Sequence, residues 1–443
     1  MTAELAVAMK ALAAVCADVR DGGPADFSGS AVLVAAPGST EEAAAVMRVA
    51  AEHELAVVAR GGGSRLAWGI PASRCDLVID MSRMSGVVEH AAGDLVARLQ
   101  AGARMGDVAA VLAQAGQEIA LDVPSVATVG GVVASGLAGP RRLRYGTPRD
   151  LLIGITIVRA DGTVAKSGGK VVKNVAGYDL GKLFAGSAGT LGLITEATFR
   201  LHPLPVARAY VTAEYVAVSV ACDAVAAAAN SPLVSSAVEL SRPALGAPIR
   251  VGVLLEGSVD GIAARSTRMA DLLGNAEVSA DPPDWWPGAP QAGPGETLIR
   301  VSFWVSALGR VLDAIEAAAD KSGVSPAIAG SAGAGVLYAV VPPAAEASAA
   351  EASAAEASAA EAGQAGAGQA HAGAAEFAAA LRDSVAGERC GVVLLAAPAA
   401  VREGLAGRGG MNGAVPGLAL MRAVKDQFDP GHRMAPGRFP DGI

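Results

Sequence analysis

Three glycine-rich segments in the first half of the chain constrain its fold more than any other feature. The first is a run of three glycines after Arg60, the second spans residues 124–139, and the third spans residues 183–195. Glycine lacks a Cβ, so backbone N–H groups in such segments can converge on one anion. Because the triple glycine follows a strand candidate at 55–59, it is either a pyrophosphate-binding loop or a structural turn.

None of the three segments has the spacing of a common nucleotide-binding motif. The triple glycine does not continue as Gly-x-Gly-x-x-Gly, and Gly181-Lys182 is followed by Leu183 instead of Ser or Thr. In the second segment, Thr128 and the glycine pair after it predict a helix whose N-terminus faces an anion. The third segment predicts a turn into a β-rich run, suited to backbone contacts with a flat ring.

Charge and hydropathy exclude several classes of partner. The chain has 43 acidic and 35 basic residues, a formal charge of −8, and its longest basic cluster is Arg141, Arg142 and Arg144. This is too small for a nucleic-acid tract. The most apolar stretch, residues 211–229, is too short and too charged to span a membrane, and the N-terminus lacks the order of a signal peptide. A cytoplasmic location is predicted.

The four cysteines exclude three kinds of metal or redox centre. Cys16, Cys75, Cys222 and Cys390 lie far apart and form no Cys-x-x-Cys. An iron–sulfur cluster, a zinc ribbon and a dithiol centre all need closer spacing. We predict no metal site in this chain.

The pattern of strands and helices predicts two main domains. An N-terminal helical segment covers residues 1–25, with its helix running to residue 20, a first domain covers 26–205, a second α+β domain covers 206–411, and a C-terminal segment covers 412–443. Inside the second domain, residues 344–375 begin with a repeated five-residue unit rich in alanine and glutamate. A five-residue period gives a helix no constant apolar face, so this insertion is predicted to be solvated and without a catalytic role.

In order and spacing, the glycine segments resemble the FAD-binding domain of the vanillyl-alcohol oxidase/p-cresol methylhydroxylase (PCMH) superfamily, over about residues 26–205. The run 168–180, followed by 182–190, resembles the D-lactate/glycolate branch, and within it the FAD-binding subunit of bacterial glycolate oxidases. The ending 428–438 resembles the terminal signature of that branch, although Ala435 stands where many members have asparagine.

This resemblance implies an α+β fold, in which a two-lobed PCMH-type FAD-binding domain is joined to a smaller α+β second domain. The second domain serves as a cap or substrate domain, and the C-terminal tail packs back on the flavin domain. The implied FAD contacts follow the chain from the pyrophosphate to the flavin and the adenine end. They are Arg60, Gly61, Gly62, Gly63, Ser64, Arg65, Pro124, Thr128, Val129, Gly130, Gly131, Ser135, Gly136, Tyr145, Gly146, Gly192 and Ile194. For Thr128, Ser135 and Tyr145, turn or core packing is the alternative role.

Covalent flavin attachment in this superfamily needs a histidine or cysteine beside the flavin. Neither residue occurs between His53 and Cys75, or anywhere in residues 124–194. The resemblance therefore implies non-covalent FAD.

The residues that would bind and deprotonate a substrate are less defined by the sequence. Oxidation of a 2-hydroxy acid needs a cation for the carboxylate, a base for the hydroxyl proton, and flavin N5 as hydride acceptor. Relatives that act alone carry a Gly-Glu-His-Gly-like motif, which this chain lacks, so its catalytic base is unknown. Arg141, Arg142 and Arg144 either bind a carboxylate or are solvated or phosphate-facing. The histidines are His53, His90, His202, His371 and His432.

These observations predict an FAD-binding subunit of a glycolate oxidase or dehydrogenase complex. It would oxidise glycolate, a small 2-hydroxy acid, to glyoxylate with hydride transfer to flavin N5. The electrons would pass to an iron–sulfur subunit, and a second flavoprotein subunit would complete a complex that can attach to the inner membrane through its partners. The alternatives are a stand-alone FAD-dependent 2-hydroxy-acid dehydrogenase and a catalytically silent flavin-binding scaffold.

Overall fold

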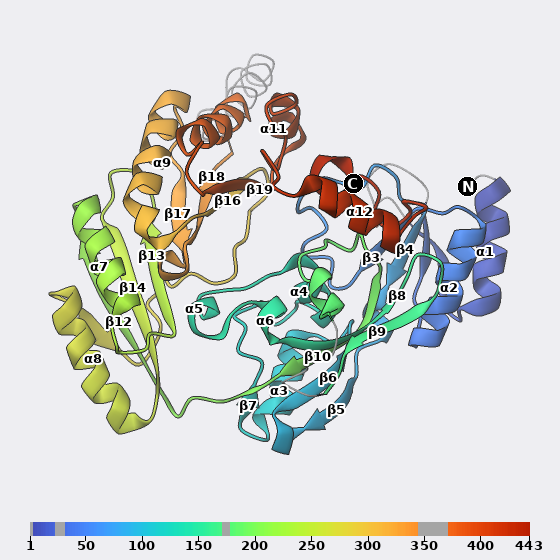
Figure 1. The fold of residues 1–443 in the computed structure, drawn as a ribbon, viewed down its shortest axis with the longest axis horizontal. Helices are drawn as coiled ribbons and strands as arrows, with labels where there is room; N and C mark the ends of the chain where they lie inside the picture. Colours follow the sequence, from blue (N-terminus) through green and yellow to red (C-terminus); the bar gives the residue numbers. More distant parts are fainter. Residues whose placement is uncertain (1–2, 23–31, 171–177, 344–370) are drawn as a thin grey trace, which may run out of the picture. The chain divides into compact units, whose positions relative to one another are not determined.

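The structure is a computed structural model that describes residues 3–22, 32–170, 178–343 and 371–443. The chain forms two compact units, shown as a ribbon in Figure 1. Unit 1 consists of Met1–Ala138, Tyr145–Leu204 and Val415–Ile443, and unit 2 consists of Gly139–Arg144 and Pro205–Ala414. The excursion of residues 139–144 into unit 2 has no counterpart in the boundaries expected from the sequence.

The first sheet of unit 1 has four strands in the order β1-β2-β4-β3. Strands β2, β3 and β4 are parallel, because helix α2 provides the crossover between β2 and β3, whereas β1 is antiparallel to β2. Helix α2 begins after the N-cap residue Ser39, whose side chain accepts a hydrogen bond from the N–H of Glu42. The elements are α1 Ala3–Val15, β1 Val19–Gly22, β2 Val32–Ala35, α2 Thr40–Glu52, β3 Val57–Arg60, β4 Leu77–Asp80 and the 3-10 helix η1 Met81–Arg83.

The second sheet of unit 1 has five antiparallel strands in the order β5-β6-β10-β8-β9. The short helix α4 packs against β10, and a separate two-stranded pairing joins β7 to β11. The elements are β5 Val87–Ala91, η2 Ala92–Asp94, β6 Val96–Gln100, α3 Met105–Ala113, β7 Gln117–Glu118, α4 Val129–Ser135, α5 Arg142–Tyr145, α6 Pro148–Leu151, β8 Leu152–Val158, β9 Val164–Gly168, η3 Leu180–Leu183, β10 Leu193–Arg200, β11 His202–Pro203, α12 Leu418–Phe428 and η6 Pro440–Gly442.

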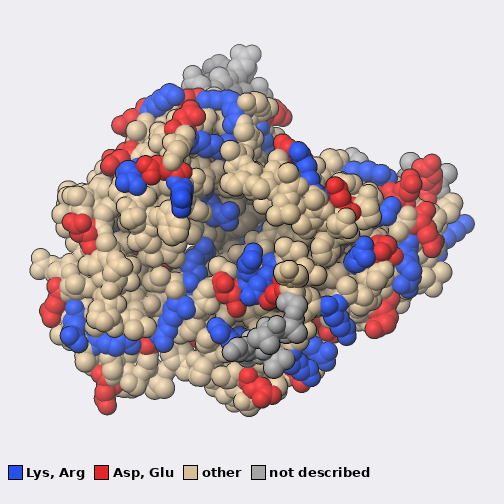
Figure 2. Space-filling view, in the orientation of Figure 1, with Lys and Arg blue, Asp and Glu red and all other residues tan. Residues whose placement is uncertain are grey.

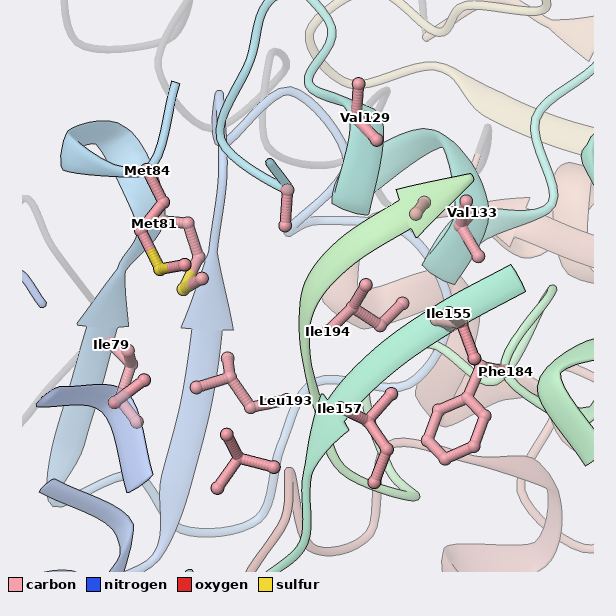
Figure 3. Packing of buried hydrophobic residues seen from close by; sticks show 14 of the residues in the cluster. Ile79, Met81, Met84, Val129, Val133, Ile155, Ile157, Phe184, Leu193 and Ile194 are labelled. Carbon is pink, nitrogen blue, oxygen red and sulfur yellow. The ribbon is translucent and has the colours of Figure 1, made fainter. Parts of the chain in front are cut away.

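One hydrophobic core joins the two sheets of unit 1 (Figure 3). Val129 and Val133 of α4 are fully buried in it, together with Phe184 and Leu193. These residues flank the glycines of the second and third segments. The core therefore fixes both segments in place, while the glycines between its members remain at the surface or in turns.

Unit 2 is built on eight antiparallel strands in the order β15-β12-β14-β13-β17-β18-β16-β19. Helices α7 and α8 pack against these strands, and α9 packs against α7. Both units contain sheets and helices, which confirms the α+β class. The elements are β12 Ala207–Tyr215, α7 Val218–Asn230, β13 Ala237–Arg242, β14 Ile249–Gly257, α8 Val259–Leu273, β15 Glu277–Ser279, β16 Thr297–Ser302, η4 Val305–Ala307, α9 Leu308–Ser322, β17 Ala327–Gly330, η5 Ala332–Ala334, β18 Val336–Val341, β19 Gly391–Ala396 and α11 Ala399–Gly404.

Two predicted segment ends are wrong. Helix α1 ends at Val15 instead of extending towards residue 20, because Val19–Gly22 pairs with β2 as strand β1. The low-complexity insertion is predicted over 344–375, but residues 371–384 are helical and Ala374 and Ala375 are buried. Residues 344–370 lie outside the described part of the chain.

The surface has no dominant sign of charge on the face drawn in Figure 2, where basic and acidic side chains are interspersed. Among the helices that the structure describes, none combines the length and apolarity needed to cross a membrane.

Candidate functional site

The first glycine segment begins where strand β3 ends. Gly62, Gly63 and Ser64 are exposed, and their N–H groups have no hydrogen-bond acceptor among the described residues. Gly63 has a φ of 75°, a conformation that side chains other than glycine rarely adopt. Consecutive N–H groups that are exposed after a strand can surround an anion such as a phosphate. This loop therefore has the donors that a pyrophosphate needs.

The two arginines that border this loop have other contacts. The Arg60 Nη2 lies 2.8 Å from Oδ2 of Asp80 on the neighbouring strand β4. Burial raises the pKa of the Asp80 carboxyl, but hydrogen bonds from Arg60 and Ser82 outweigh it and hold that pKa below its usual range. The guanidinium of Arg65 stacks on the ring of Trp68, 4.2 Å from its centroid. Both arginines thus stabilise the shape of the loop.

The second glycine segment opens helix α4 as predicted, with Thr128 at the N-cap. Its N–H groups, however, already have acceptors. Gly130 N–H donates to the carbonyl of Ala101 at 2.7 Å, and Gly131 N–H donates to Thr128 Oγ1 at 3.3 Å. Val129 N–H donates to the carbonyl of Ala103, two residues after Ala101, at 2.9 Å. The N–H groups of residues 129–131 are therefore already occupied and are not free for a cofactor.

The first and second segments contact each other directly. A Cβ on Gly61 would lie 2.1 Å from Thr128 Oγ1, and a Cβ on Gly62 would lie 2.9 Å from the carbonyl oxygen of Val126. Both distances are too short for a side chain. Glycine is therefore required at 61 and 62 by packing against the second segment, independently of any anion.

The third segment is bound to the C-terminal end of α4. Gly186 N–H donates to the carbonyl of Val133 at 2.9 Å, and Ala188 N–H donates to Ala134 at 2.8 Å. Gly136 ends the helix with a φ of 65°, and a Cβ there would lie 3.4 Å from the Cα of residue 186. The close approach of two glycine backbones brings the second and third segments together.

Three further predicted contacts are Ser135, Tyr145 and Gly146. The Ser135 hydroxyl donates to the Gly131 carbonyl at 2.7 Å, within its own helix. The ring of Tyr145 meets the ring of His202 edge to face, with centroids 4.8 Å apart. Gly146 has a φ of 84°, which a turn at this position requires.

Ile194 lies in strand β10 of the second sheet of unit 1, and Gly192 comes directly before this strand. A Cβ on Gly192 would lie 3.1 Å from the carbonyl oxygen of Val158, and Ile194 is paired with Ile157 on β8. The Ile194 side chain is buried in the core (Figure 3). Pro124, the last predicted contact, accepts a backbone hydrogen bond from Ala127 in the turn before α4.

The C-terminal segment runs beside the first glycine segment. Val57 on β3 accepts a hydrogen bond from the N–H of Ala435 and donates its own to Arg433, both at 2.7 Å. The guanidinium of Arg438 donates to two carbonyls of the loop after the triple glycine, one of them that of Trp68 at 3.1 Å. The terminal signature therefore supports the loop from the side of β3.

A buried ion pair joins the third segment to the terminal one. The Lys425 Nζ lies 2.7 Å from Asp429 Oδ2 and donates to the carbonyls of Thr190 at 2.8 Å and Met434 at 2.9 Å. Lys425 and Asp429 are 1% and 0% exposed. Burial lowers the pKa of Lys425, and Asp429 opposes this effect. All three ammonium donors are thus occupied.

These contacts connect four segments in a closed ring: residues 60–65, 124–136, 183–195 and 425–438, named here the four-segment ring. Gly61 touches Thr128, α4 bonds to residues 186 and 188, Lys425 bonds to Thr190, and the terminal segment returns to β3. Sequence reasoning indicated these segments but missed the pair of Lys425 and Asp429 that joins two of them. The signal for this pair is the i, i+4 spacing of a lysine and an aspartate at an otherwise polar helix end.

The family model described as an FAD binding domain matches residues 31–168. This span contains the triple-glycine loop with its exposed N–H donors, and helix α4. Residues 31–168 belong to the FAD-binding domain family. The predicted FAD cofactor is thereby confirmed, and the donors of the loop fit its pyrophosphate. The assignment of individual contact residues stays a prediction.

Similar proteins extend this identification. The chain is 34% identical over 215 residues to the glycolate oxidase subunit GlcD of Bacillus subtilis, covering 48% of this chain and 46% of that protein. It is 38% identical over 152 residues to the glycolate oxidase subunit GlcE of Escherichia coli, covering 34% of this chain and 43% of that protein. The chain thus matches less than half the length of either relative.

The likeness in fold extends beyond the family match. The structure of p-cresol methylhydroxylase with bound substrate aligns with a TM-score of 0.73 over 99% of this chain and 97% of that chain, at 15% identity. This likeness confirms the predicted PCMH-type fold.

Unit 2 holds the three arginines for which the sequence left a carboxylate-binding role open. Arg141 is buried and its Nη1 lies 3.4 Å from Glu256, so a solvated role is wrong for this residue. Arg144 donates to Ser236 at 3.3 Å, and Arg142 donates to the hydroxyl of Tyr338 at 3.0 Å. Among the described residues, no group of three His, Cys, Asp or Glu side chains could hold a metal ion.

Proposed function

We propose that the chain is the FAD-bearing subunit of a glycolate oxidase or dehydrogenase complex, which oxidises glycolate to glyoxylate. The observation that carries the proposal is the similarity of part of the chain to two glycolate oxidase subunits. Bound FAD supplies a two-electron acceptor for the hydride on the carbon that bears the hydroxyl group. Glycolate would lose that hydride and its hydroxyl proton.

The chain's own residues would bind and orient the cofactor. In this proposal the N–H groups of Gly62, Gly63 and Ser64 hold the pyrophosphate, and the remaining predicted contacts lie along the four-segment ring. FAD would be bound non-covalently. In support, burial is the main cause that raises the pKa of Cys75 to about 12 and of Cys16 to about 11, so neither thiol is an active nucleophile at neutral pH.

Electron transfer would need partners. The chain has no Cys-x-x-Cys, so an iron–sulfur subunit and a second flavoprotein subunit would accept the electrons. This part of the proposal is supported by the relatives, which are named as subunits.

A second candidate is a flavin-binding scaffold whose partner subunit performs the oxidation. It is favoured by the contacts of two histidines, because each imidazole, a possible base, is engaged with a neighbouring side chain. His90 is hydrogen-bonded to Gln117 at 2.9 Å, and His432 lies 3.0 Å from Asp426 on the surface of α12. Neither belongs to a Gly-Glu-His-Gly-like motif.

Anaerobic reduction of the flavin tests the proposal. The chain is purified alone and with its co-expressed partners, and glycolate is added under argon while the flavin absorbance is followed. Bleaching in the chain alone supports direct oxidation, whereas bleaching only in the complex supports the scaffold. Ethylene glycol, which lacks the carboxylate, is the control. Acid precipitation should release all flavin into the supernatant, and fluorescence on the denatured protein would contradict non-covalent binding.

A further inference from the structure

Two strands of unit 2 place a charged side chain directly opposite a phenol. In the antiparallel pair of β16 and β18, Arg300 is the register partner of Tyr338. Residues directly opposite each other in such a pair project from the same face of the sheet. The neighbours Ile299 and Val301 are fully buried on the other face. Arg300 and Tyr338 are only partly buried, so a small ligand can reach them.

A second guanidinium joins this pair from the segment that crosses into unit 2. The Arg142 Nη2 lies 3.0 Å from the Tyr338 hydroxyl, and its Cζ lies 6.0 Å from the centre of the phenol ring. Its Nε donates to the carbonyl of Gly139 at 3.1 Å, which fixes the direction of the side chain. Two guanidinium groups therefore meet at one phenol.

The charge of Arg300 is not balanced within the described part of unit 2. Its Nε is buried without a hydrogen-bond acceptor, and no carboxylate lies within ion-pair distance of it among the described residues. Burial lowers the pKa of Arg300, Tyr338 opposes this shift, and the charge of Arg142 adds to it. A partly buried cation beside a second cation is stabilised when an anion is bound.

Other arginines of unit 2 show the usual arrangement. Arg141 and Arg208 share the carboxylate of Glu256, at 3.4 and 3.1 Å. Arg242 is paired with Glu316. Arg265 and Arg382 lack a carboxylate partner but donate to backbone carbonyls instead. The group of Arg300, Arg142 and Tyr338, named here the arginine–tyrosine site, differs because Arg300 has neither a carboxylate nor a carbonyl acceptor among the described residues.

We propose that the arginine–tyrosine site binds the carboxylate of a small organic acid. Resting on the proposed function, that acid is the 2-hydroxy-acid substrate. A guanidinium presents parallel N–H donors whose spacing matches the two oxygens of a carboxylate, and the Tyr338 hydroxyl supplies one more donor. Of the three arginines clustered in the sequence, Arg142 takes this role, while Arg141 is neutralised by Glu256.

The test measures binding without turnover. Oxalate, which cannot be oxidised at a hydroxyl group, is titrated calorimetrically into the full FAD-loaded chain and into Arg300→Gln. Loss of the charge-assisted hydrogen bonds should weaken oxalate binding by about 10- to 100-fold. Arg310→Gln is the matched control, because Arg310 is exposed and paired with Glu388. Its affinity for oxalate should equal that of the unaltered chain.

Several outcomes overturn the proposal. These are no binding of oxalate to the unaltered chain, equal binding to Arg300→Gln, and tighter binding of inorganic phosphate than of oxalate. FAD content and melting temperature check that Arg300→Gln is folded. If it is not, Tyr338→Phe gives the same comparison with one donor removed. Glycolate oxidation is measured separately. If oxalate binding depends on Arg300 but the protein does not oxidise glycolate, the arginine–tyrosine site stands and the proposed function is rejected. If glycolate is oxidised with an unchanged KM in Arg300→Gln, the proposed function stands and the site is rejected.

Discussion

Replacing Lys425 with methionine should destabilise unit 1 strongly. The substitution keeps the volume of the side chain but removes a cation that donates to Asp429, Thr190 and Met434. Asp429 would then be a buried carboxylate without its counter-charge, although two backbone N–H groups still donate to it. Breaking one side of such a buried pair costs about 3–5 kcal/mol. This is a large fraction of the roughly 5–15 kcal/mol that stabilises a domain.

Urea denaturation of the FAD-loaded chain measures this effect, with flavin release as the signal for unit 1. With a slope of about 2 kcal/mol per molar urea, the midpoint should fall by about 2 M. Lys170→Met is the control, because Lys170 forms a solvent-exposed pair with Glu89 that water screens. If Lys425→Met and Lys170→Met release flavin at the same urea concentration, the buried pair does not hold the four-segment ring together.

Three more outcomes are expected. Gly62→Val, whose Cβ would lie 2.9 Å from the Val126 carbonyl oxygen, should purify without FAD while its circular dichroism is retained. The control Gly93→Val, at an open surface position, should keep FAD. A full flavin content in Gly62→Val would refute the role of the loop. Glu42→Gln should lower the free energy of unfolding by about 1–2 kcal/mol, because Glu42 accepts two backbone N–H groups. Burial raises the pKa of Glu42, but these hydrogen bonds outweigh it and lower the pKa below 4.5. The difference in free energy of unfolding between the unaltered chain and Glu42→Gln should therefore be complete above pH 4.5 and vanish as the pH falls further. Glu41→Gln, exposed on the same turn, should change little at any pH, and a pH-independent loss in Glu42→Gln would contradict the argument. Finally, burial raises the pKa of all four thiols. A thiol reagent at neutral pH should therefore react slowly with the native chain and completely with the unfolded chain. Fast labelling of the native chain would show an activated cysteine and contradict this expectation.

Local signals in the sequence predicted much of unit 1. Ser39 marked the start of α2 because a cap is a contact between neighbours in the chain. The glycine segments likewise indicated the loops after β3 and around α4.

Contacts between distant parts of the chain could not be predicted in this way. The pairing of Val19–Gly22 with β2 converts a helical pattern into a strand, and nothing near Val19 in the sequence indicates it. Arg300 lies within an apolar strand, and a lone charge in such a strand is a signal that can be read in advance. Its neighbours Tyr338 and Arg142 are 38 and 158 positions away in the sequence, so the arginine–tyrosine site is visible only in the fold.

The six-residue excursion of Gly139–Arg144 limits how this protein can be cut, shuffled or recombined. A gene fragment for residues 205–414 would encode all eight strands of the unit 2 sheet, but it would lack Arg142 and also Arg141, one of the two arginines that pair with Glu256. Exchange of unit 2 between relatives would therefore transfer a complete arginine–tyrosine site only if this hexapeptide, embedded in the coding region of unit 1, were exchanged in the same event. Chimaeras made at residue 205 alone would inherit Arg142 from one parent, and Arg300 and Tyr338 from the other.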